Sequence, residues 1–242
     1  MNALELFQSG KLQAAIQALG EEVRNAPLDA RRRIFLFELL CFAGDYDRAE
    51  KHLDIIAGGS QAANVGALLY RSAIHAERTR QKMFEDSSFP MPRKPLEASG
   101  HSSAGSFLGF ADADPRIGGA LEVFVAGSYS WIDFEQIASI EVPHPKRLRD
   151  LLWTPAIVTT TPEYRAMELG EVLLPVVSPL SWKQSDDSVR LGRSTVWEAD
   201  PIHGEIPFGQ KLFLAGEEEI PILELGKVEL SVHSGATDAL PS

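Results

Sequence analysis

The sequence predicts an α+β protein of two domains: an N-terminal TPR-like α–α superhelix (TPR, tetratricopeptide repeat) followed by a β-rich α+β domain. Three observations predict this class. Residues 1–86 carry helical periodicity with an internal echo, residues 87–109 are crowded with Pro, Ser and Gly, and short β-rich runs follow from residue 110. We therefore expect a helical domain over 1–86, a linker over 87–109, a β-rich domain over 110–232 and a disordered tail over 233–242.

The internal echo has a period of 34 residues, which is that of a tetratricopeptide helix–turn–helix unit. Shifting the chain by this period lays FQSGKLQAAIQAL on CFAGDYDRAEKHL, so that Gly10 meets Gly44 and Ala15 meets Ala49. Glycine permits the tight turn between two helices, and alanine lets the helices approach closely. The alternative is an ordinary pair of helical hairpins in which glycine and alanine match by chance.

Apolar residues at helical spacing justify each element of the first domain. The predicted helices cover residues 2–9, 12–25, 29–43, 46–57 and 61–85. The last helix has an apolar stripe that includes Ala67, Ala73 and Ile74. We assign its charged residues, among them Glu77 and Arg80, to the polar face.

The β-rich part begins with a hairpin pattern, LEVFVAGSYSWIDF, whose two runs meet at Gly127 and Ser128. Further short runs follow, from IASIEV to EIPILELGKVEL. The segment RLRDLLWTPA predicts a one-turn helix that docks Trp153 onto the sheet. Its Arg149 and Asp150 are then available for capping or for a surface ion pair.

Composition narrows the function classes. The net charge is −11, and it is unevenly shared: residues 1–86 carry 11 Lys and Arg against 12 Asp and Glu, and residues 87–242 carry 12 against 22. This acidity disfavours nucleic-acid binding. No apolar run is long enough for a membrane span, and no basic cluster opens the chain, so we expect neither membrane insertion nor a signal peptide. Cys41, the single cysteine, reads as a buried structural thiol in a reducing cytoplasm.

Few residues carry a catalytic pattern. Asp112 and Asp114 could bind a divalent cation or act as acid and base, with His144 as a third group in an uncharacterised hydrolase. The favoured alternative is a structural turn in which Arg116 pairs with one of the two carboxylates. The histidines show no metal-ligand spacing, and phosphate-binding and dinucleotide-binding motifs are missing, so we predict no metal, no cofactor and no enzyme activity.

Several motifs, in order, resemble the ImpE/TagJ family of type VI secretion accessory proteins. They are RRRIFLFELLCFAGDYDRAEKHLD, YRSAIHAERTRQKMF, FADADPRIGGALEVFVAGSYSWIDFEQIASIEV and RDLLWTPA. The family-marking residues among them are Asp112, Asp114, Arg116, Arg149, Asp150 and Trp153. The chain departs from the family between RTRQKMF and ADAD, where we expect relatives to carry a longer helical segment.

The resemblance implies a non-enzymatic cytoplasmic adaptor of the type VI secretion system. Such proteins contact the small subunit of the contractile sheath, TssB, and are linked to the ClpV ATPase that recycles contracted sheath. An α–α superhelix suits this role because it binds a partner helix or peptide without catalytic residues. The alternatives are a generic TPR-like module with another partner, and the hydrolase that uses Asp112 and Asp114.

A partner surface is predicted on the helix over 29–43, because the first helix of a tetratricopeptide hairpin lines the concave face. Arg31, Ile34, Glu38 and Cys41 recur at a spacing of three to four residues and form one stripe. The alternative is that Ile34 and Cys41 pack inside and only Arg31 and Glu38 see solvent. The surface around Trp153 is the second candidate.

Overall fold

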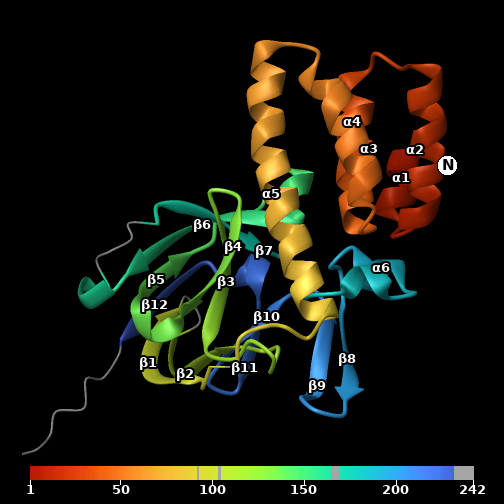
Figure 1. Cartoon of the computed structure of the whole chain (residues 1–242). Coiled ribbons are helices and arrows are strands. Elements are labelled where there is room, and N and C mark those ends of the chain that lie inside the picture. Colours follow the sequence, from red (N-terminus) through yellow and green to blue (C-terminus); the bar gives the residue numbers. More distant parts are fainter. Residues whose placement is uncertain (92, 103–104, 165–168, 232–242) are drawn as a thin grey trace, which may run out of the picture.

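The computed structural model describes residues 1–91, 93–102, 105–164 and 169–231, and Figure 1 shows the chain. Helices fill the N-terminal part and a large antiparallel sheet fills most of the rest, which confirms the predicted α+β class. The predicted tail, 233–242, lies outside the described residues. None of the described helices is both long enough and apolar enough to cross a membrane.

Local sequence explains the N-terminal helices, whose predicted bounds are within one residue of the observed ones. They are α1 (Ala3–Gln8), α2 (Leu12–Asn25), α3 (Ala30–Phe42), α4 (Tyr46–Ala57) and α5 (Gln61–Glu85). The side chains of Asn2, Asp29, Asp45 and Ser60 accept hydrogen bonds from the first free amides of α1, α3, α4 and α5. The apolar faces then pack each helix against the next.

The residues of the 34-residue echo have the predicted roles. Gly10 and Gly44 have φ of 78° and 71°, a left-handed conformation that glycine adopts without strain, and they turn the chain from α1 to α2 and from α3 to α4. Ala15 and Ala49 are fully buried between helices. Gly44 has a second constraint, because a Cβ there would lie 2.6 Å from the Trp182 ring.

In the described residues, ten strands form one antiparallel sheet in the order β11-β10-β2-β1-β12-β5-β6-β7-β3-β4. The strands are β1 (Leu96–Ser102), β2 (Gly105–Asp112), β3 (Ala120–Val125), β4 (Ser128–Asp133), β5 (Ile137–Glu141), β6 (Trp153–Thr160), β7 (Glu171–Pro175), β10 (Leu212–Ala215), β11 (Glu218–Pro221) and β12 (Lys227–Ser231). The predicted hairpin is β3–β4, with its turn at Ala126 and Gly127.

The linker predicted over 87–109 is wrong for its second half, because β1 and most of β2 lie there and pair in the middle of the sheet order. Gly100 explains the error. It pairs across the strands with Phe107, and a Cβ at Gly100 would lie 2.3 Å from the Phe107 ring. This glycine makes room for an aromatic ring that covers it from the neighbouring strand, so it does not mark a loop.

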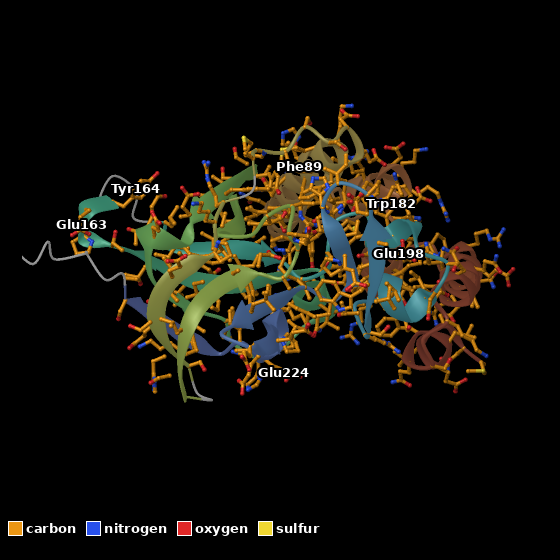
Figure 2. All side chains as sticks on the ribbon, turned by 90° about the horizontal axis from the view of Figure 1, so that it is seen from below. Phe89, Glu163, Tyr164, Trp182, Glu198 and Glu224 are labelled. Carbon is orange, nitrogen blue, oxygen red and sulfur yellow. The ribbon has the colours of Figure 1, made fainter. Side chains whose placement is uncertain are left out.

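Smaller elements connect the sheet to the helices. The one-turn helix η2 (Leu148–Leu151) precedes β6, as the sequence predicts, and the remaining 3-10 turns are η1 (Phe134–Gln136), η3 (Pro162–Tyr164), η4 (Ser181–Lys183) and η5 (Ile222–Glu224). The short helix α6 (Asp187–Arg190) leads into a separate two-stranded ribbon of β8 (Thr195–Asp200) and β9 (Gly204–Gly209). Figure 2 shows Trp182 of η4 on the side of the molecule where the N-terminal helices lie, and Tyr164 at the far end of the sheet.

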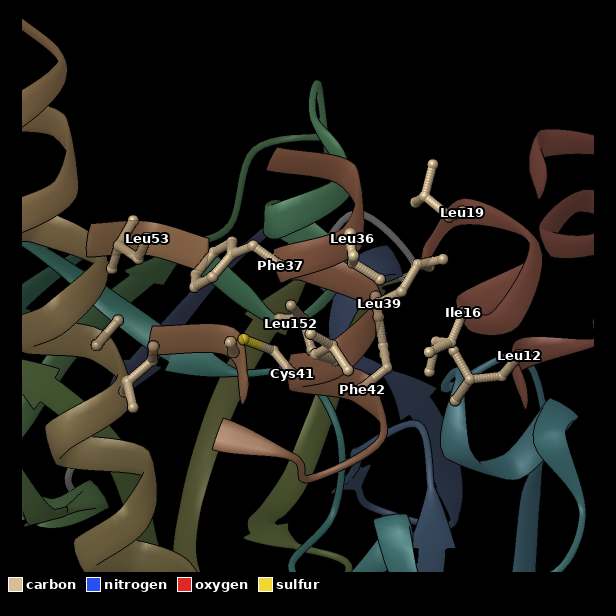
Figure 3. Close-up of a cluster of buried hydrophobic side chains, with 14 of the residues drawn as sticks. Leu12, Ile16, Leu19, Leu36, Phe37, Leu39, Cys41, Phe42, Leu53 and Leu152 are labelled. Carbon is tan, nitrogen blue, oxygen red and sulfur yellow. The ribbon is translucent and has the colours of Figure 1, made fainter. Parts of the chain in front are cut away.

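The helices and the sheet region share one hydrophobic core. Leu152 and Trp153 belong to the same buried cluster as the residues of α2, α3 and α4. Figure 3 shows Leu152 close to Cys41 and Phe42. A second buried hydrophobic cluster consists mainly of side chains from the strands of the large sheet. The helical part is therefore packed onto the sheet region by a continuous apolar contact.

The Gly44 turn gives a first testable prediction. Gly44→Ala places a β-carbon both at positive φ and against Trp182, so we expect it to destabilise the protein by about 2 kcal/mol or more. Gly20→Ala is the matched control: Gly20 lies inside α2 with nothing within 4 Å of the added carbon. This change should stabilise by about 0.5–1 kcal/mol. Urea unfolding of both variants measures the two effects, and equal stabilities would contradict the prediction.

Candidate protein-binding surface and the ion network beneath it

The N-terminal half of α5 exposes apolar side chains to solvent. Val65, Leu68 and Leu69 are 63%, 60% and 63% exposed. Figure 1 shows this half of α5 rising beyond the sheet beside α3 and α4, whereas the other half lies against the strands. Clustered apolar residues on a rigid helix are typical of a protein-binding surface.

A first groove lies between α3 and α5. Its volume is about 370 Å³, and nearly all of its surface is apolar. The small residues Ala63, Gly66 and Ala67 on α5 leave this space unfilled, since even a Cβ at Gly66 would meet nothing within 4 Å. The lining residues are Ala30, Ile34, Phe37, Leu53, Ile56, Gly59, Ser60, Ala63, Gly66, Ala67 and Tyr70.

A second groove, of about 340 Å³, lies on the sheet side of α5. Phe124 of β3 and Leu173 of β7, which pair across these two strands, line it on the side of the sheet. Its other walls come from Leu68 and Leu69 of α5, from the β3–β4 turn, and from Arg149 and Trp153.

Tyr70 is the wall that both grooves share. Its hydroxyl donates to Glu38 Oε1 at 3.4 Å, and its ring packs edge-on against Phe37 at 4.8 Å between centroids. The Arg149 guanidinium lies 5.6 Å from the ring centroid on the sheet side. We call the two grooves, Tyr70 and the exposed Val65 together the Tyr70 surface.

The structure separates the predicted stripe on α3. Arg31 is exposed and Ile34 lines the groove between α3 and α5, but Cys41 and Glu38 are buried. The alternative therefore describes Cys41 correctly. Neither prediction has Glu38 buried. The burial of Glu38 involves Tyr70 and Arg149, which are distant in sequence, so the local pattern gives no sign of it.

Burial governs the chemistry of these two groups. It raises the pKa of Glu38 to about 7, although the Tyr70 hydroxyl and the Arg149 charge act in the opposite direction. Burial also raises the pKa of the Cys41 thiol, with a further contribution from the nearby Glu38 charge. The thiol is therefore held protonated, as a structural side chain requires.

Trp153 is the first residue of β6, which begins just after the short helix η2, and it too is buried. Its indole NH donates to Glu77 Oε2 of α5 at 2.8 Å. The neighbouring Asp150 caps the turn by accepting from the amides of Lys146 and Arg147, and its other oxygen lies 3.4 Å from Arg149 Nε. The predicted capping and ion-pair roles of this pair are both present.

Below the Tyr70 surface, a buried ion network joins α5 to the sheet. Arg80 Nε and Nη2 donate to the two oxygens of Glu122 at 2.7 and 3.0 Å, and Nη1 donates to Glu77 at 3.0 Å. Lys211 Nζ lies 2.7 Å from Glu122 Oε2, the oxygen that Arg80 Nη2 also contacts, and it pairs with Asp112 as well. All five side chains are buried.

The predicted carboxylates Asp112 and Asp114 belong to this network. Asp114 forms the expected ion pair with Arg116, whose Nη2 lies 2.5 Å from Oδ2, and Asp112 accepts from the Asp114 amide. His144 is exposed on a loop after β5, and no hydrogen bond or ion pair of the described residues links it to either aspartate. Within the described residues, no group of three or more His, Cys, Asp or Glu could hold a metal ion.

Burial and the neighbouring charges together explain the pKa shifts in the network. Glu77, Glu122, Asp112 and Asp114 face three cations, Arg80, Lys211 and Arg116. Arg80 and Lys211 hold the pKa of Glu122 well below its usual range, despite its burial. Burial raises the pKa of Asp112 above its ordinary value, with Lys211 opposing and the Glu122 and Asp114 charges adding to the rise.

Comparison with known proteins identifies the family. The sequence model of the ImpE protein family matches residues 104–229. The type VI secretion system accessory component TagJ of Pseudomonas aeruginosa is 31% identical over 263 aligned residues, which cover 95% of this chain and 91% of that protein. The chain belongs to the ImpE family.

The fold has been seen in a crystal structure of protein VPA1032 from Vibrio parahaemolyticus. That structure superposes with a TM-score of 0.82 at 23% sequence identity, over 95% of this ImpE chain and 97% of the other. The likeness supports the arrangement of helices on a sheet that holds the Tyr70 surface.

Arg80 provides a stability test of the ion network. Arg80→Met keeps the side-chain volume but leaves Glu122 and Glu77 short of a cation, so we expect a loss of about 3–5 kcal/mol. Lys82→Met on the same helix removes an exposed pair with Asp86 and should cost less than about 1 kcal/mol. Urea titration gives both values, and similar losses would rule out a special role for the buried network.

Glu38 provides a pH test. Its folded pKa is raised from 4.5 to about 7, so its contribution to stability is full below pH 4.5 and is lost as the pH rises through 7. Relative to Glu38→Gln, the wild-type protein should lose up to roughly 3 kcal/mol between pH 4.5 and 8. Both proteins keep Asp112, so its titration cancels in the difference. A stability difference that does not change with pH would contradict the assignment.

Proposed function

We propose that this protein is a non-enzymatic accessory adaptor of the type VI secretion system. In this role it binds the TssB-like small sheath subunit in the cytoplasm and works with the ClpV ATPase that recycles the sheath. The family membership and the accessory role of the Pseudomonas relative in type VI secretion support the assignment to the secretion system. The observation that supports an adaptor is the exposed apolar Tyr70 surface with its two open grooves.

The shape of the Tyr70 surface suits a partner helix. The two grooves flank α5, with Tyr70 between them, and an amphipathic helix presents apolar side chains at a spacing of three to four residues that can enter successive depressions. Ile34 and Phe37 form the apolar wall on one side, while Arg149 and Glu171 supply charges of both signs on the other. Apolar contacts then give affinity, and the charges set the direction of the bound helix.

The geometry favours this reading over a hydrolase. Asp112 and Asp114 are both buried and are held by Lys211 and Arg116, so their oxygens serve the ion network. A generic module with an unrelated partner would use the same Tyr70 surface, and the identity of the captured protein separates the two.

The test is binding of the purified small sheath subunit to the full-length protein. Leu68→Glu/Leu69→Glu places two charges in the wall of the second groove, and we expect affinity to fall at least about tenfold, or about 1.4 kcal/mol. The control Leu4→Glu/Ile202→Glu makes the same change at two exposed apolar residues elsewhere and should bind as the wild type does. Calorimetric titration measures the affinity, and melting curves check folding.

Two outcomes would overturn separate parts of the proposal. If the wild-type protein does not bind the sheath subunit, the partner is wrong. If it binds, and the Leu68/Leu69 variant binds equally well, the partner stands but the Tyr70 surface is not the contact site.

A further inference from the structure

A groove larger than either groove of the Tyr70 surface lies away from that surface, between α2 and α4, with α3 beneath it. Its volume is about 840 Å³, and none of its lining residues lines either groove of the Tyr70 surface. The space beside Gly20 is open, since a Cβ there would meet nothing within 4 Å. The lining residues are Gln13, Ile16, Gln17, Gly20, Glu21, Val23, Arg24, Pro27, Arg33, Leu36, Arg48 and His52. We call it the α2–α4 groove.

Its walls are basic, in contrast to the acidic chain around them. Arg24, Arg33 and Arg48 line it, against the single carboxylate of Glu21, while the whole chain has a net charge of −11. Arg24 lies 3.5 Å from Glu21, and both side chains are largely exposed, so this pair is weak. Arg48 pairs with Asp45 outside the groove lining, at 2.9 Å.

Of the three arginines that line the groove, Arg33 is the one that forms no ion pair with a carboxylate of the described residues. Its Nε donates to the Pro27 carbonyl at 2.8 Å, and its Nη1 lies 3.4 Å from His52 Nδ1. These contacts fix the direction of the guanidinium but do not neutralise it. Burial lowers the pKa of His52, and the nearby Arg33 and Arg48 charges lower it further.

The floor of the α2–α4 groove is apolar, since Ile16, Val23 and Leu36 lie there with their side chains mostly buried. A floor of this kind below cationic walls matches a peptide that carries acidic residues around an apolar one. Nucleic acid fits poorly, because the charge of the chain as a whole repels a phosphate backbone.

We propose that the α2–α4 groove is a second protein-binding site, which takes an acidic peptide segment of a partner with an apolar residue at its centre. The site is independent of the proposed function, because it shares no lining residue with the Tyr70 surface. The carboxylates of the segment pair with Arg33 and Arg48, and its apolar side chain covers Leu36.

The test uses the full chain and a fluorescein-labelled peptide in which leucines are spaced among glutamates. Binding of the peptide is measured by fluorescence anisotropy at low salt. Arg33→Glu/Arg48→Glu should weaken this binding at least about tenfold. The matched control is Arg31→Glu/Lys51→Glu, which makes the same charge change on the same two helices at exposed residues outside the groove. Arg33→Gln/Arg48→Gln removes the two charges without reversing them, in case the glutamate variant does not fold, and it should show a smaller loss of peptide affinity.

Two further readouts make the test specific. First, the glutamates of the bound peptide should raise the pKa of His52, which is measured by NMR with the His52 signal assigned from the His52→Asn variant. Second, Leu68→Glu/Leu69→Glu should leave peptide binding unchanged. Equal losses of peptide affinity in the two double charge-reversal variants would mean that binding depends only on the overall charge of the protein, and would overturn the proposal. So would equally tight binding of a single-stranded oligonucleotide, or self-association that Arg33→Glu/Arg48→Glu abolishes, since a second copy would then be the occupant.

Discussion

The arrangement of this protein depends on the burial of one guanidinium group. Arg80 lies in the middle of the interface between α5 and the sheet, and a charge in that position is tolerated only when it is fully paired. Its two-pronged contact with Glu122 fixes both the distance and the rotation of α5 over β3. Lys211 extends the same constraint from Glu122 to Asp112 at the end of β2, so strands far apart in the sheet order share one electrostatic centre.

That anchoring accounts for the Tyr70 surface. Because the C-terminal half of α5 is fixed by Arg80 and by the contact of Glu77 with Trp153, the N-terminal half extends past the sheet as a rigid element. Its apolar side chains are then presented without a cover, and the β3–β4 turn closes against Ser72 because Gly127 has no side chain. The network is structural, but it places the residues that we propose bind the partner.

Local patterns predicted the helices, since caps such as Asp29 and Ser60 and the apolar periodicity act within a few residues. They failed where the partner of a residue is distant. Gly100 looked like part of a loop because the ring of Phe107 comes from the next strand. Arg80 looked solvated because Glu122 is 42 residues away. The one local clue was its spacing from Ala73 and Phe84, which puts it on the buried face of α5.

The distribution of charge gives the two candidate sites different chemistry. The acidic residues are concentrated after residue 86, whereas the α2–α4 groove collects arginines from three helical segments around an apolar floor. The Tyr70 surface is mainly apolar, and its nearest charges, Arg149 and Glu171, are of opposite sign. A partner chosen by apolar fit and a partner chosen by negative charge therefore do not compete for the same residues. Because α3 contributes different side chains to the α2–α4 groove and to the groove between α3 and α5, one rigid helix can hold the two proposed partners in a fixed relation, which is what an adaptor would require.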